Sequence, residues 1–506
     1  MVGERRIEAP QGRKPMGLLK LLFDTNVFYA CVDIAPGRRH PDSAVATRLL
    51  ELLNRHGGEA WLTPATRRDI DRTSNTELRS ASNLLMRQWL TLDPLTVPRR
   101  LLEAARYELP LGDNDDVDSH MLAALDAESV DFLITQDKAL RRHAGYAGLG
   151  DRTMTITDGI ELLERLLGES TPLPTVRPCA AYGLPAEDPL FERLRAGDSG
   201  FDVWFRRARQ EHRPCFAIDG ESGLDAVAIL KTENDPRHGI GGTVLKISSF
   251  VVADGAEGAK REELLLKSVL DYAAGEEHDR IYIEIYPHHD RLVPLLEQFG
   301  FVDGGARTDR GEAVLCKDRR PAAADAQLDP LAYHRRFGPP ALLVRNAFVV
   351  PIQPRWHDAL FPEARPQPEL FAPLAPGNAM LKAYLSGSNI QRVEAGALIL
   401  FYRSEDRRAV TAVGVVDGVL RSNDPVEIRR FVGARTVYSD VQVHALCAGD
   451  RGVLAILFRH DRVLSAPWPL DEMVQADVVR DAPQTIQEVT NEAALSWIRQ
   501  RLEAPR

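Results

Sequence analysis

Short apolar runs alternate with helical patterns over the first third of the chain. The runs LLKLLFD, EAWLTP and VDFLITQD are typical of buried strands, whereas SAVATRLLELLNRH and DSHMLAALDAE carry apolar residues at helical spacing. Strands that alternate with helices are typical of a parallel sheet covered by helices. We therefore predict an α/β/α unit with a parallel sheet over residues 18–167.

Two further units follow in the pattern. Residues 187–320 begin with helical segments, continue into the strands PCFAIDG, LDAVAILKTE and TVLKISSFVV, and then show the helix KREELLLKSVLDYAAGE before the strand RIYIEIYP. This order predicts an α+β unit. Over residues 331–506, runs such as AGALILFYRS, AVTAVGVVDGVL and VLAILFRH predict a mostly antiparallel sheet or small β-barrel. Stretches rich in Pro and small residues predict linkers at 168–186 and 321–330.

Length and composition agree with this multidomain α/β organisation. The chain has 506 residues, which is too long for one hydrophobic core, and its 27% of charged residues is typical of globular proteins. The net charge of −10 neither favours nor excludes a nucleic-acid partner, because one domain can still present a basic face. The five cysteines are never spaced as CxxC, so we expect reduced, structural cysteines and no zinc site.

The pattern of apolar residues also indicates where in the cell the protein is located. The apolar run over 18–23 ends at Asp24, too early for a signal peptide, and no window reaches the roughly 18 uncharged apolar residues that a membrane span needs. We therefore expect a cytoplasmic protein without a membrane partner.

Acidic residues follow two of the predicted strands of the first unit. Asp24 ends LLKLLFD, and Asp137 ends VDFLITQD two residues after Thr135. Groups at the carboxyl ends of parallel strands line the crevice where ligands bind. Asp69 lies in the first turns of a helix after Thr63-Pro64, and Asp118 begins another helix. Several converging carboxylates are what a catalytic Mg²⁺ or Mn²⁺ needs for phosphodiester hydrolysis.

The order of these motifs resembles the PIN-domain family of ribonucleases across the whole first unit. The matching motifs are DTN at 24–26, an acidic residue on a helix, Asp followed by SHMLAAL, and TQD at 135–137. The resemblance implies a metal-dependent endoribonuclease with RNA as substrate and Mg²⁺ or Mn²⁺ as cofactor. The catalytic and metal-binding residues that it implies are Asp24, Asp69, Asp118 and Asp137.

Two alternatives stay open within this set of carboxylates. The family usually has Glu at the second position, so Asp71 or Glu77 could replace Asp69. Further carboxylates could join the metal shell or form an exposed acidic turn, namely Asp113, Asp115 and Asp116.

Basic residues flank the first strand and favour a phosphate backbone as partner: Arg38, Arg39, His40, Arg48, Arg55, Arg67, Arg68, Arg72, Arg79 and Arg87.

The second unit resembles the GNAT acetyltransferase family in the succession LKISSFVV, ELLLKSVLDYA, IYIEIYP and LLEQFGFV. The resemblance implies acetyl-CoA at the start of the long helix, with Gly258, Lys260 and Arg261 as candidate contacts. Lys260 and Glu262 stand where the family has close-approach residues, and Leu296 stands where it often has a Tyr general acid. These departures favour a scaffold that has lost or altered acetyl transfer. An active N-acetyltransferase for an RNA-associated or protein amine is the alternative.

The third unit resembles the PUA-like superfamily, in particular ASCH and EVE-type domains, over NAMLKAYLSGSNIQRVEAGALILFYRSED and AVTAVGVVDGV. The resemblance implies a small barrel that binds RNA and directs the nuclease. A non-catalytic RNA-binding module is a further alternative, and an antitoxin, a regulatory protein or a second copy of the chain are possible partners. The candidate RNA contacts are Lys382, Ser388, Arg403, Ser404, Arg435 and Tyr438.

Overall fold

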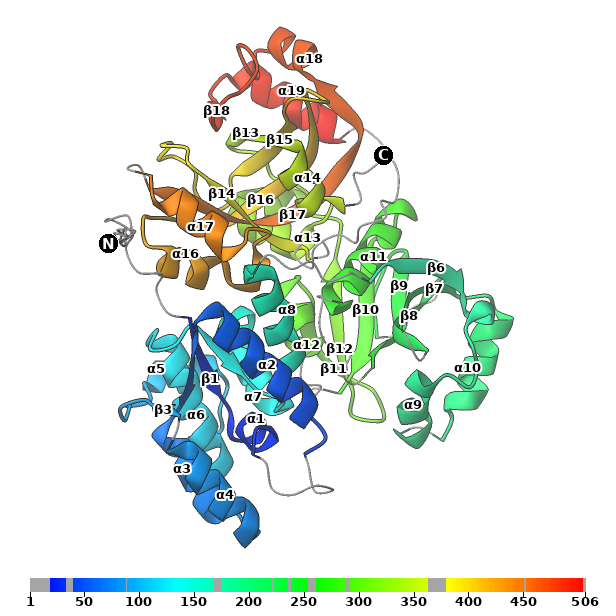
Figure 1. Cartoon of the computed structure of the whole chain (residues 1–506). Helices are drawn as coiled ribbons and strands as arrows, with labels where there is room; N and C mark the ends of the chain where they lie inside the picture. Colours follow the sequence, from blue (N-terminus) through cyan, green and yellow to red (C-terminus); the bar gives the residue numbers. More distant parts are fainter. Residues whose placement is uncertain are drawn as a thin grey trace, which may run out of the picture.

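Three sheets organise the chain into three units (Figure 1). The structure is a computed structural model, and it describes residues 19–32, 40–87, 89–167, 174–197, 199–220, 223–234, 238–253, 261–286, 292–362, 379–449 and 452–503. In Figure 1 the first unit lies at the lower left, the second at the right and the third at the top. The predicted multidomain α/β architecture is confirmed.

The first sheet has five parallel strands in the order β3-β2-β1-β4-β5. They are β1 (Lys20–Phe23), β2 (Glu59–Leu62), β3 (Leu90–Thr91), β4 (Phe132–Ile134) and β5 (Thr153–Met154). The helices are α1 (Thr25–Ala30), α2 (Ser43–His56), α3 (Pro64–Arg72), α4 (Thr76–Met86), α5 (Arg99–Ala104), α6 (Asp113–Asp126), α7 (Lys138–Tyr146) and α8 (Ile156–Leu166). The predicted parallel sheet is therefore confirmed.

Each face of this sheet is covered by its own apolar cluster. Leu52 of α2 and Leu163 of α8 pack against Leu21 and Phe23 on one face. On the other face, Leu122 of α6 packs with residues such as Leu22. Side chains alternate between the faces of a strand, so β1 is buried on both sides, which explains its uninterrupted apolar run.

The second unit contains a seven-stranded mixed sheet in the order β11-β12-β10-β9-β8-β7-β6, in which only β9 and β10 are parallel among the described pairs. Its strands are β6 (Val176–Ala180), β7 (Pro214–Asp219), β8 (Leu224–Glu233), β9 (Val244–Val252), β10 (Arg280–Ile285), β11 (Val302–Arg307) and β12 (Ala313–Asp318). Its helices are α9 (Glu192–Gly197), α10 (Phe201–Gln210), α11 (Arg261–Gly275) and α12 (Leu292–Gln298). The predicted α+β order is present.

The predicted linker at 168–186 is wrong in part, because residues 176–180 form β6 and pair with β7. Pro178 made this segment resemble a linker, so the sequence did not predict the strand. A proline lacks a backbone N–H, but it is tolerated at an edge strand, where β6 lies. Likewise, the predicted linker at 321–330 contains a short 3₁₀ helix at Ala323–Gln327 and ends on α13 (Pro330–Phe337).

The third unit has a six-stranded sheet in the order β14-β17-β16-β15-β13-β18. Its strands are β13 (Ala347–Ile352), β14 (Leu381–Ser386), β15 (Leu398–Arg403), β16 (Ala409–Ser422), β17 (Val453–Pro469) and β18 (Gln487–Val489). Its other helices are α14 (Pro354–Leu360), α16 (Pro425–Val432), α17 (Asp440–Cys447), α18 (Leu470–Gln475) and α19 (Glu492–Glu503). Only β13 and β15 pair in parallel among its described strands, so the sheet is mostly antiparallel, as predicted.

Closure of this sheet into a barrel is not confirmed. Within the described strands, β14 and β18 lie at opposite ends of the order and do not pair with each other. The long strands β16 and β17 contribute side chains to two separate apolar cores. One core contains Val416 and Phe458, and the other contains Val410 and Trp468. The two cores show that the sheet packs on both faces.

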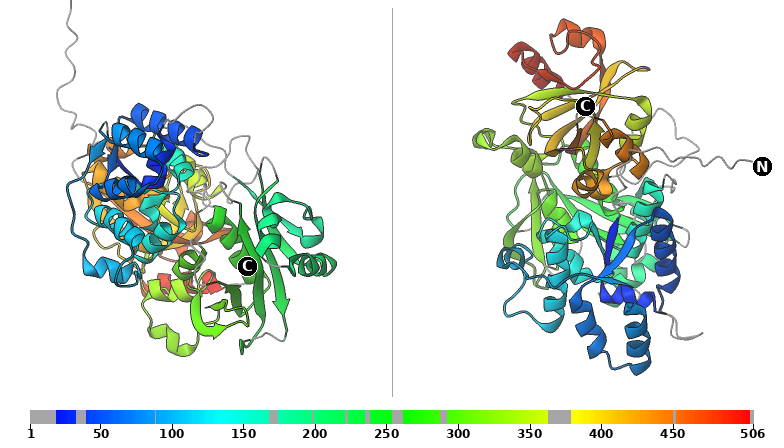
Figure 2. Two further views of the ribbon diagram at one scale, coloured as in Figure 1. Left: turned by 90° about the horizontal axis from the view of Figure 1, so that it is seen from below. Right: turned by 60° about the vertical axis from the view of Figure 1, so that its left-hand side comes forward.

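Charged side chains of the α16–α17 segment join the three units. Figure 2 shows this orange segment next to the first unit. Arg430 Nε lies 2.7 Å from Asp131 Oδ1 of the first unit. Arg435 is only 3% exposed and pairs with both Asp151 of the first unit, at 2.6 Å, and Glu263 of the second. A buried arginine therefore lies where all three units meet.

No helix in the described ranges is long and apolar enough to cross a membrane.

Candidate functional site

The first sheet reverses its strand order between β1 and β4. The chain adds β2 and β3 on one side of β1, and then β4 and β5 on the other. In open α/β sheets, ligands bind at this switch point, outside the carboxyl ends of the strands. Asp24 and Thr135 are the first residues after β1 and β4, and the backbone N–H of Asp24 donates to Ile134 O at 3.0 Å. Both strand ends therefore deliver polar residues to the same crevice.

Asp24 is fixed in this crevice by two short hydrogen bonds. Thr135 Oγ1 donates to Asp24 Oδ2 at 2.5 Å, and the backbone N–H of Thr25 donates to Oδ1 at 2.5 Å. The residue is 5% exposed. Burial, together with the charges of Asp137 and Asp69, raises the pKa of Asp24 to about 6 despite these bonds. The Asp24 carboxylate is thus well positioned and hard to ionise.

Two more of the predicted carboxylates lie around Asp24. Asp137 begins α7, where its Oδ1 accepts from Leu140 N at 2.9 Å. Asp69 Oδ2 accepts from Thr25 Oγ1 at 2.9 Å. The contact with Thr25 favours Asp69 over Asp71, whose side chain is 59% exposed and lies 4.0 Å from Arg67. The helical register of α3 therefore directs Asp69, rather than Asp71, to the end of β1.

Asp118 completes the set from α6. Burial is the largest cause that raises its pKa, to about 8, and the charges of Asp24, Asp137, Asp115 and Asp69 add to it. Among the residues that the structure describes, none forms a hydrogen bond or an ion pair with the Asp118 carboxylate. The four predicted residues therefore share one electrostatic environment, in which the largest charge effects on Asp118 come from other carboxylates.

The remaining acidic residues and the nearby arginines lie at the rim. The Asp113 side chain is 89% exposed and lies 3.7 Å from Arg72 Nη1, while Asp116 pairs with Arg68 at 2.7 Å. Arg72 also lies 3.6 Å from Asp69 Oδ1. The exposed position of Asp113 agrees with the acidic-turn interpretation. Both arginines are part of the predicted basic surface, and their charges are partly offset by these carboxylates.

The donor chemistry of the site fits a hard divalent cation. Its carboxylates are the oxygen ligands that Mg²⁺ and Mn²⁺ prefer, and Asp118 carries oxygens that no protein group engages within the described residues. As they stand, however, no three His, Cys, Asp or Glu side chains of the described chain are arranged to hold one ion. The metal ligation by these aspartates stays a prediction.

Sequence reasoning missed two aromatic residues beside the carboxylates. Tyr107 and His143 stack with ring centroids 4.0 Å apart, and Asp118 is among the charges that raise the pKa of Tyr107, after burial. The buried Tyr107 hydroxyl has no hydrogen-bond partner in the part of the chain that the structure places. His143 Nδ1 donates to Ala105 O at 2.7 Å, which leaves Nε2 as the acceptor of the neutral ring. Neither residue follows a strand, so no strand-end signal marks them.

A second polar cluster lies where β9 and β10 separate. The two strands pair only from Val244 to Ile247 on β9, although β9 continues to Val252. Glu284 follows the last paired residue of β10 and lies 2.6 Å from Lys246 Nζ and 2.8 Å from His238 Nε2. Ser248 Oγ, the first position of β9 past the paired region, is a buried polar atom without a partner in the described structure. Polar side chains therefore gather at the point where the two strands stop pairing.

Only one of the three predicted acetyl-CoA contacts, Arg261, lies within the described residues. Gly258 and Lys260 lie outside the described residues. Arg261 begins α11 and pairs with Asp225 at 3.2 Å. Glu263, in the first turn of α11, is buried against Arg435 and accepts from Met380 N at 3.0 Å. Leu296 is fully buried in the core of the second unit, in agreement with an apolar role at that position.

The predicted RNA contacts of the third unit lie mainly in its interior. Lys382 is fully buried and its Nζ donates to Leu360 O at 2.7 Å. The Tyr438 hydroxyl donates to Leu385 O at 3.2 Å, and its ring stacks on Trp356. Arg435 forms the junction described above. These three residues have internal partners, because burial of a polar group is costly unless it is hydrogen-bonded.

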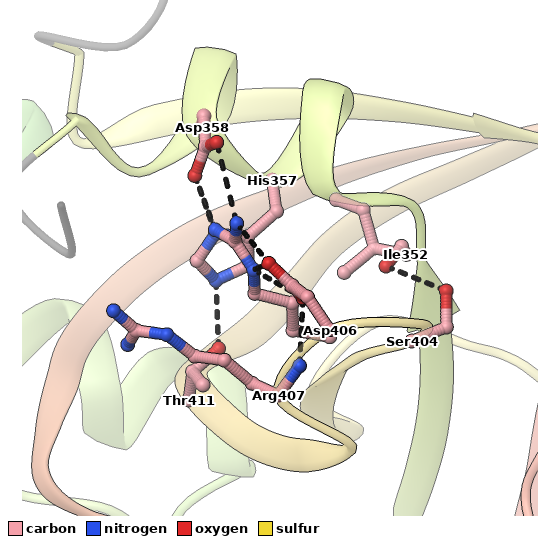
Figure 3. A network of polar contacts seen from close by, with 8 residues as sticks. Ile352, His357, Asp358, Ser404, Asp406, Arg407 and Thr411 are labelled. Carbon is pink, nitrogen blue, oxygen red and sulfur yellow. Dashed lines mark hydrogen bonds and ion pairs between the residues drawn. The ribbon is translucent and has the colours of Figure 1, made fainter. Parts of the chain in front are cut away.

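Arg403 belongs to a polar network at the end of β15 (Figure 3). Its guanidinium contacts Asp358, binds Asp406 at 2.6 Å, and donates to His357 Nδ1 at 3.0 Å. Burial, and then the Arg403 charge, lower the pKa of His357 to about 4, so its Nε2 donates to Thr411 Oγ1 at 2.7 Å. The network anchors α14 on the sheet.

The last two predicted RNA contacts, Ser404 and Ser388, also form hydrogen bonds with backbone groups. Ser404 Oγ donates to Ile352 O at 3.1 Å, and Ser388 Oγ accepts from Ile390 N at 3.4 Å. Ser388 is 6% exposed. The six predicted contacts therefore do not form one exposed surface, and their RNA-binding role stays a prediction.

Comparison with known proteins yields structural neighbours only. No family model and no curated protein matches the chain. The ASCH protein from Zymomonas mobilis is 14% identical and covers 31% of this chain and 95% of its own, with a TM-score of 0.24. An N-acetyltransferase from Staphylococcus aureus Mu50 is 15% identical and covers 29% of this chain and 98% of its own, with a TM-score of 0.24.

A GNAT family acetyltransferase from Elizabethkingia anophelis with acetyl-CoA bound is also similar. It is 15% identical and covers 29% of this chain and 97% of its own, with a TM-score of 0.23. The neighbours of this chain thus include ASCH and GNAT proteins. The resemblance of the first unit to PIN ribonucleases stays a prediction from its own residues.

The raised pKa of Asp118 predicts a pH-dependent gain in stability for Asp118→Asn. The folded state binds a proton on Asp118 more tightly than the unfolded state, so wild type loses stability as the pH rises from about 4 to about 8. Asn lacks this charge. In the absence of divalent ions, we expect Asp118→Asn to raise the Tm clearly at pH 8.5 and much less at pH 5, by differential scanning fluorimetry. A Tm difference that is the same at both pH values, or larger at pH 5, contradicts the charge cluster.

Proposed function

We propose that the first unit is a metal-dependent phosphodiesterase that cleaves RNA at the carboxylate site. One observation carries this proposal: carboxylates from four separate segments interact at the switch point of the parallel sheet. A structural role explains single acidic residues at helix starts, because such positions favour negative charge. It does not explain why like charges are brought together in a half-buried crevice, where their repulsion opposes folding.

Three of the four predicted ligands are held by hydrogen bonds from the surrounding structure. Thr135 and Thr25 hold Asp24, the start of α7 holds one oxygen of Asp137, and Thr25 also orients Asp69. Such supporting contacts keep ligands in productive positions. A divalent ion bound here supplies an activated water and neutralises charge on the phosphate.

The chain's own groups then account for substrate binding. Arg68 and Arg72 lie at the rim, where their half-exposed side chains can exchange a carboxylate partner for a phosphate oxygen. The stacked Tyr107 and His143 lie next to the carboxylates and offer an aromatic surface and an acceptor nitrogen. RNA, rather than another phosphodiester, is the substrate that the PIN resemblance implies.

The proposal predicts that Asp24→Asn removes ribonuclease activity. Purified full-length protein is incubated with total RNA in the presence of Mn²⁺ or Mg²⁺, and cleavage is followed on denaturing gels. Because loss of a supporting contact alone costs roughly 10- to 100-fold at metal sites, we expect loss of Asp24 to reduce the rate by at least about 100-fold. EDTA is expected to abolish cleavage.

Asp126→Asn is the matched control, because Asp126 lies on the same helix as Asp118 but pairs with Arg100 at 2.7 Å away from the cluster. It should retain wild-type activity. Equal cleavage by wild type and Asp24→Asn, or no metal-dependent cleavage of any RNA by wild type, contradicts the proposal.

Acetyl-CoA binding by the second unit is a second candidate function. The specific observation in its favour is that β9 and β10 stop pairing after Ile247 and Ile283, next to the polar side chains of Ser248 and Glu284. The negative charge of Glu263, which lies beside the predicted close-approach residue Glu262, is paired with Arg435. A GNAT neighbour has acetyl-CoA bound, and the same ligand is proposed here. Leu296 provides no general acid, so we propose binding rather than rapid transfer.

Calorimetric titration of the full-length protein with acetyl-CoA tests this candidate. We expect saturable binding to wild type and its loss in Ser248→Trp, because the larger side chain would occupy the proposed ligand position where β9 and β10 stop pairing. Leu84→Trp, at an exposed position of the first unit, is the control for the substitution itself and should bind like wild type. Absence of heat with wild type at millimolar acetyl-CoA contradicts the candidate, as does equal binding by Ser248→Trp.

A further inference from the structure

Two cysteines of the second unit lie directly opposite each other on neighbouring strands. Cys179 of β6 is the register partner of Cys215 of β7. Ala181 N donates to Arg213 O at 2.8 Å two positions away, so Cys179 and Cys215 occupy the same type of hydrogen-bonded pair. The Cα atoms of such pairs lie about 5.5 Å apart, within the range of roughly 4.4 to 6.8 Å that disulfides span. The register therefore places the two cysteines at a Cα separation that a disulfide can span.

The two thiols differ in their surroundings. Cys215 is 1% exposed and its Sγ lies 3.3 Å from Arg213 O, whereas Cys179 is partly exposed on the edge strand. A hydrogen bond from Cys215 and the positive charge of Arg177, on the same face of β6, lower the pKa of Cys179. The same interaction raises the pKa of Cys215. A partly exposed thiol with a lowered pKa thus lies beside a buried thiol, an arrangement suited to oxidation in two steps.

We propose that Cys179 and Cys215 form a redox modification site that a hydroperoxide converts to a cross-strand disulfide. In the first step, the Cys179 thiolate attacks the hydroxyl oxygen of the hydroperoxide, the O–O bond breaks, and the leaving oxygen takes a proton from solvent and departs as water or an alcohol. Cys179 is oxidised to the sulfenic acid. In the second step, the Cys215 sulfur attacks the sulfenic sulfur, the S–O bond breaks, and the hydroxide leaves as water with the Cys215 proton.

The position of the pair gives the disulfide a structural consequence. β6 is the edge of its sheet and the first strand of the second unit after the chain leaves α8 of the first. A covalent bond to β7 fastens this edge to the sheet. The site is independent of the carboxylate cluster, and it accounts for a cysteine pair that spacing along the sequence does not mark.

The other three cysteines serve as internal controls. Burial raises the pKa of Cys31 to about 12 and those of Cys316 and Cys447 to about 11. These thiols are therefore poor nucleophiles at neutral pH. They should remain reduced under conditions that oxidise the pair.

The test treats reduced, full-length protein with a small excess of hydrogen peroxide at pH 7, blocks free thiols, and maps the peptides by mass spectrometry. We expect loss of two thiols, a mass decrease of two hydrogens, and a peptide linked through Cys179 and Cys215 that dithiothreitol separates. In Cys215→Ser, dimedone should label Cys179 as the sulfenic acid. Arg177→Gln should retain all five thiols but react with iodoacetamide more slowly at Cys179.

Cys316→Ser, which removes a control thiol, should form the same linked peptide as wild type. Three results overturn the proposal: the folded wild type yields no Cys179–Cys215 link while its thiols are consumed, Cys179 oxidises directly to the sulfinic acid although Cys215 is present, or the link appears only after denaturation.

Discussion

Repulsion among carboxylates at the end of β1 is the constraint on which this account depends. Burial, and then the charges of the neighbouring carboxylates, raise the pKa of Asp24 and of Asp118. Four other buried or partly buried carboxylates among the described residues lie next to cations. Asp440 pairs with His56 and Arg429, and the same pattern of nearby cations holds for Asp461, Asp417 and Glu263. A crevice that gathers carboxylates without comparable cations is consistent with a cationic ligand.

Buried ion pairs hold the unit that carries the carboxylate site against the rest of the protein. Arg435 links Asp151 and Glu263, and Arg430 binds Asp131, so the third unit is held against the first two through groups that are costly to leave unpaired. The helices that carry the carboxylates belong to the same first unit. Residues that resembled RNA contacts in the sequence are thus used to hold the protein together, and an RNA-directing role of the third unit has to rest on other residues.

The sequence predicted the parts of this architecture that depend on local pattern. The apolar run ending at Asp24 placed β1 and its carboxylate correctly, because a central parallel strand is buried on both faces. β6 was missed because Pro178 interrupts its pattern. The distinction between Asp69 and Asp71 depends on how α3 packs, and the roles of Lys382 and Arg435 depend on burial. The Tyr107–His143 stack and the Cys179–Cys215 pair join distant segments, so neither has a local signal.

The most direct test of the central claim is a crystal structure of the protein grown with Mn²⁺ and measured at the manganese absorption edge. The account predicts an anomalous peak within about 2.0 to 2.5 Å of oxygens from at least two of Asp24, Asp118 and Asp137. A well-ordered site without an anomalous peak, in which the Asp118 carboxylate is hydrogen-bonded or paired with an arginine, would contradict it.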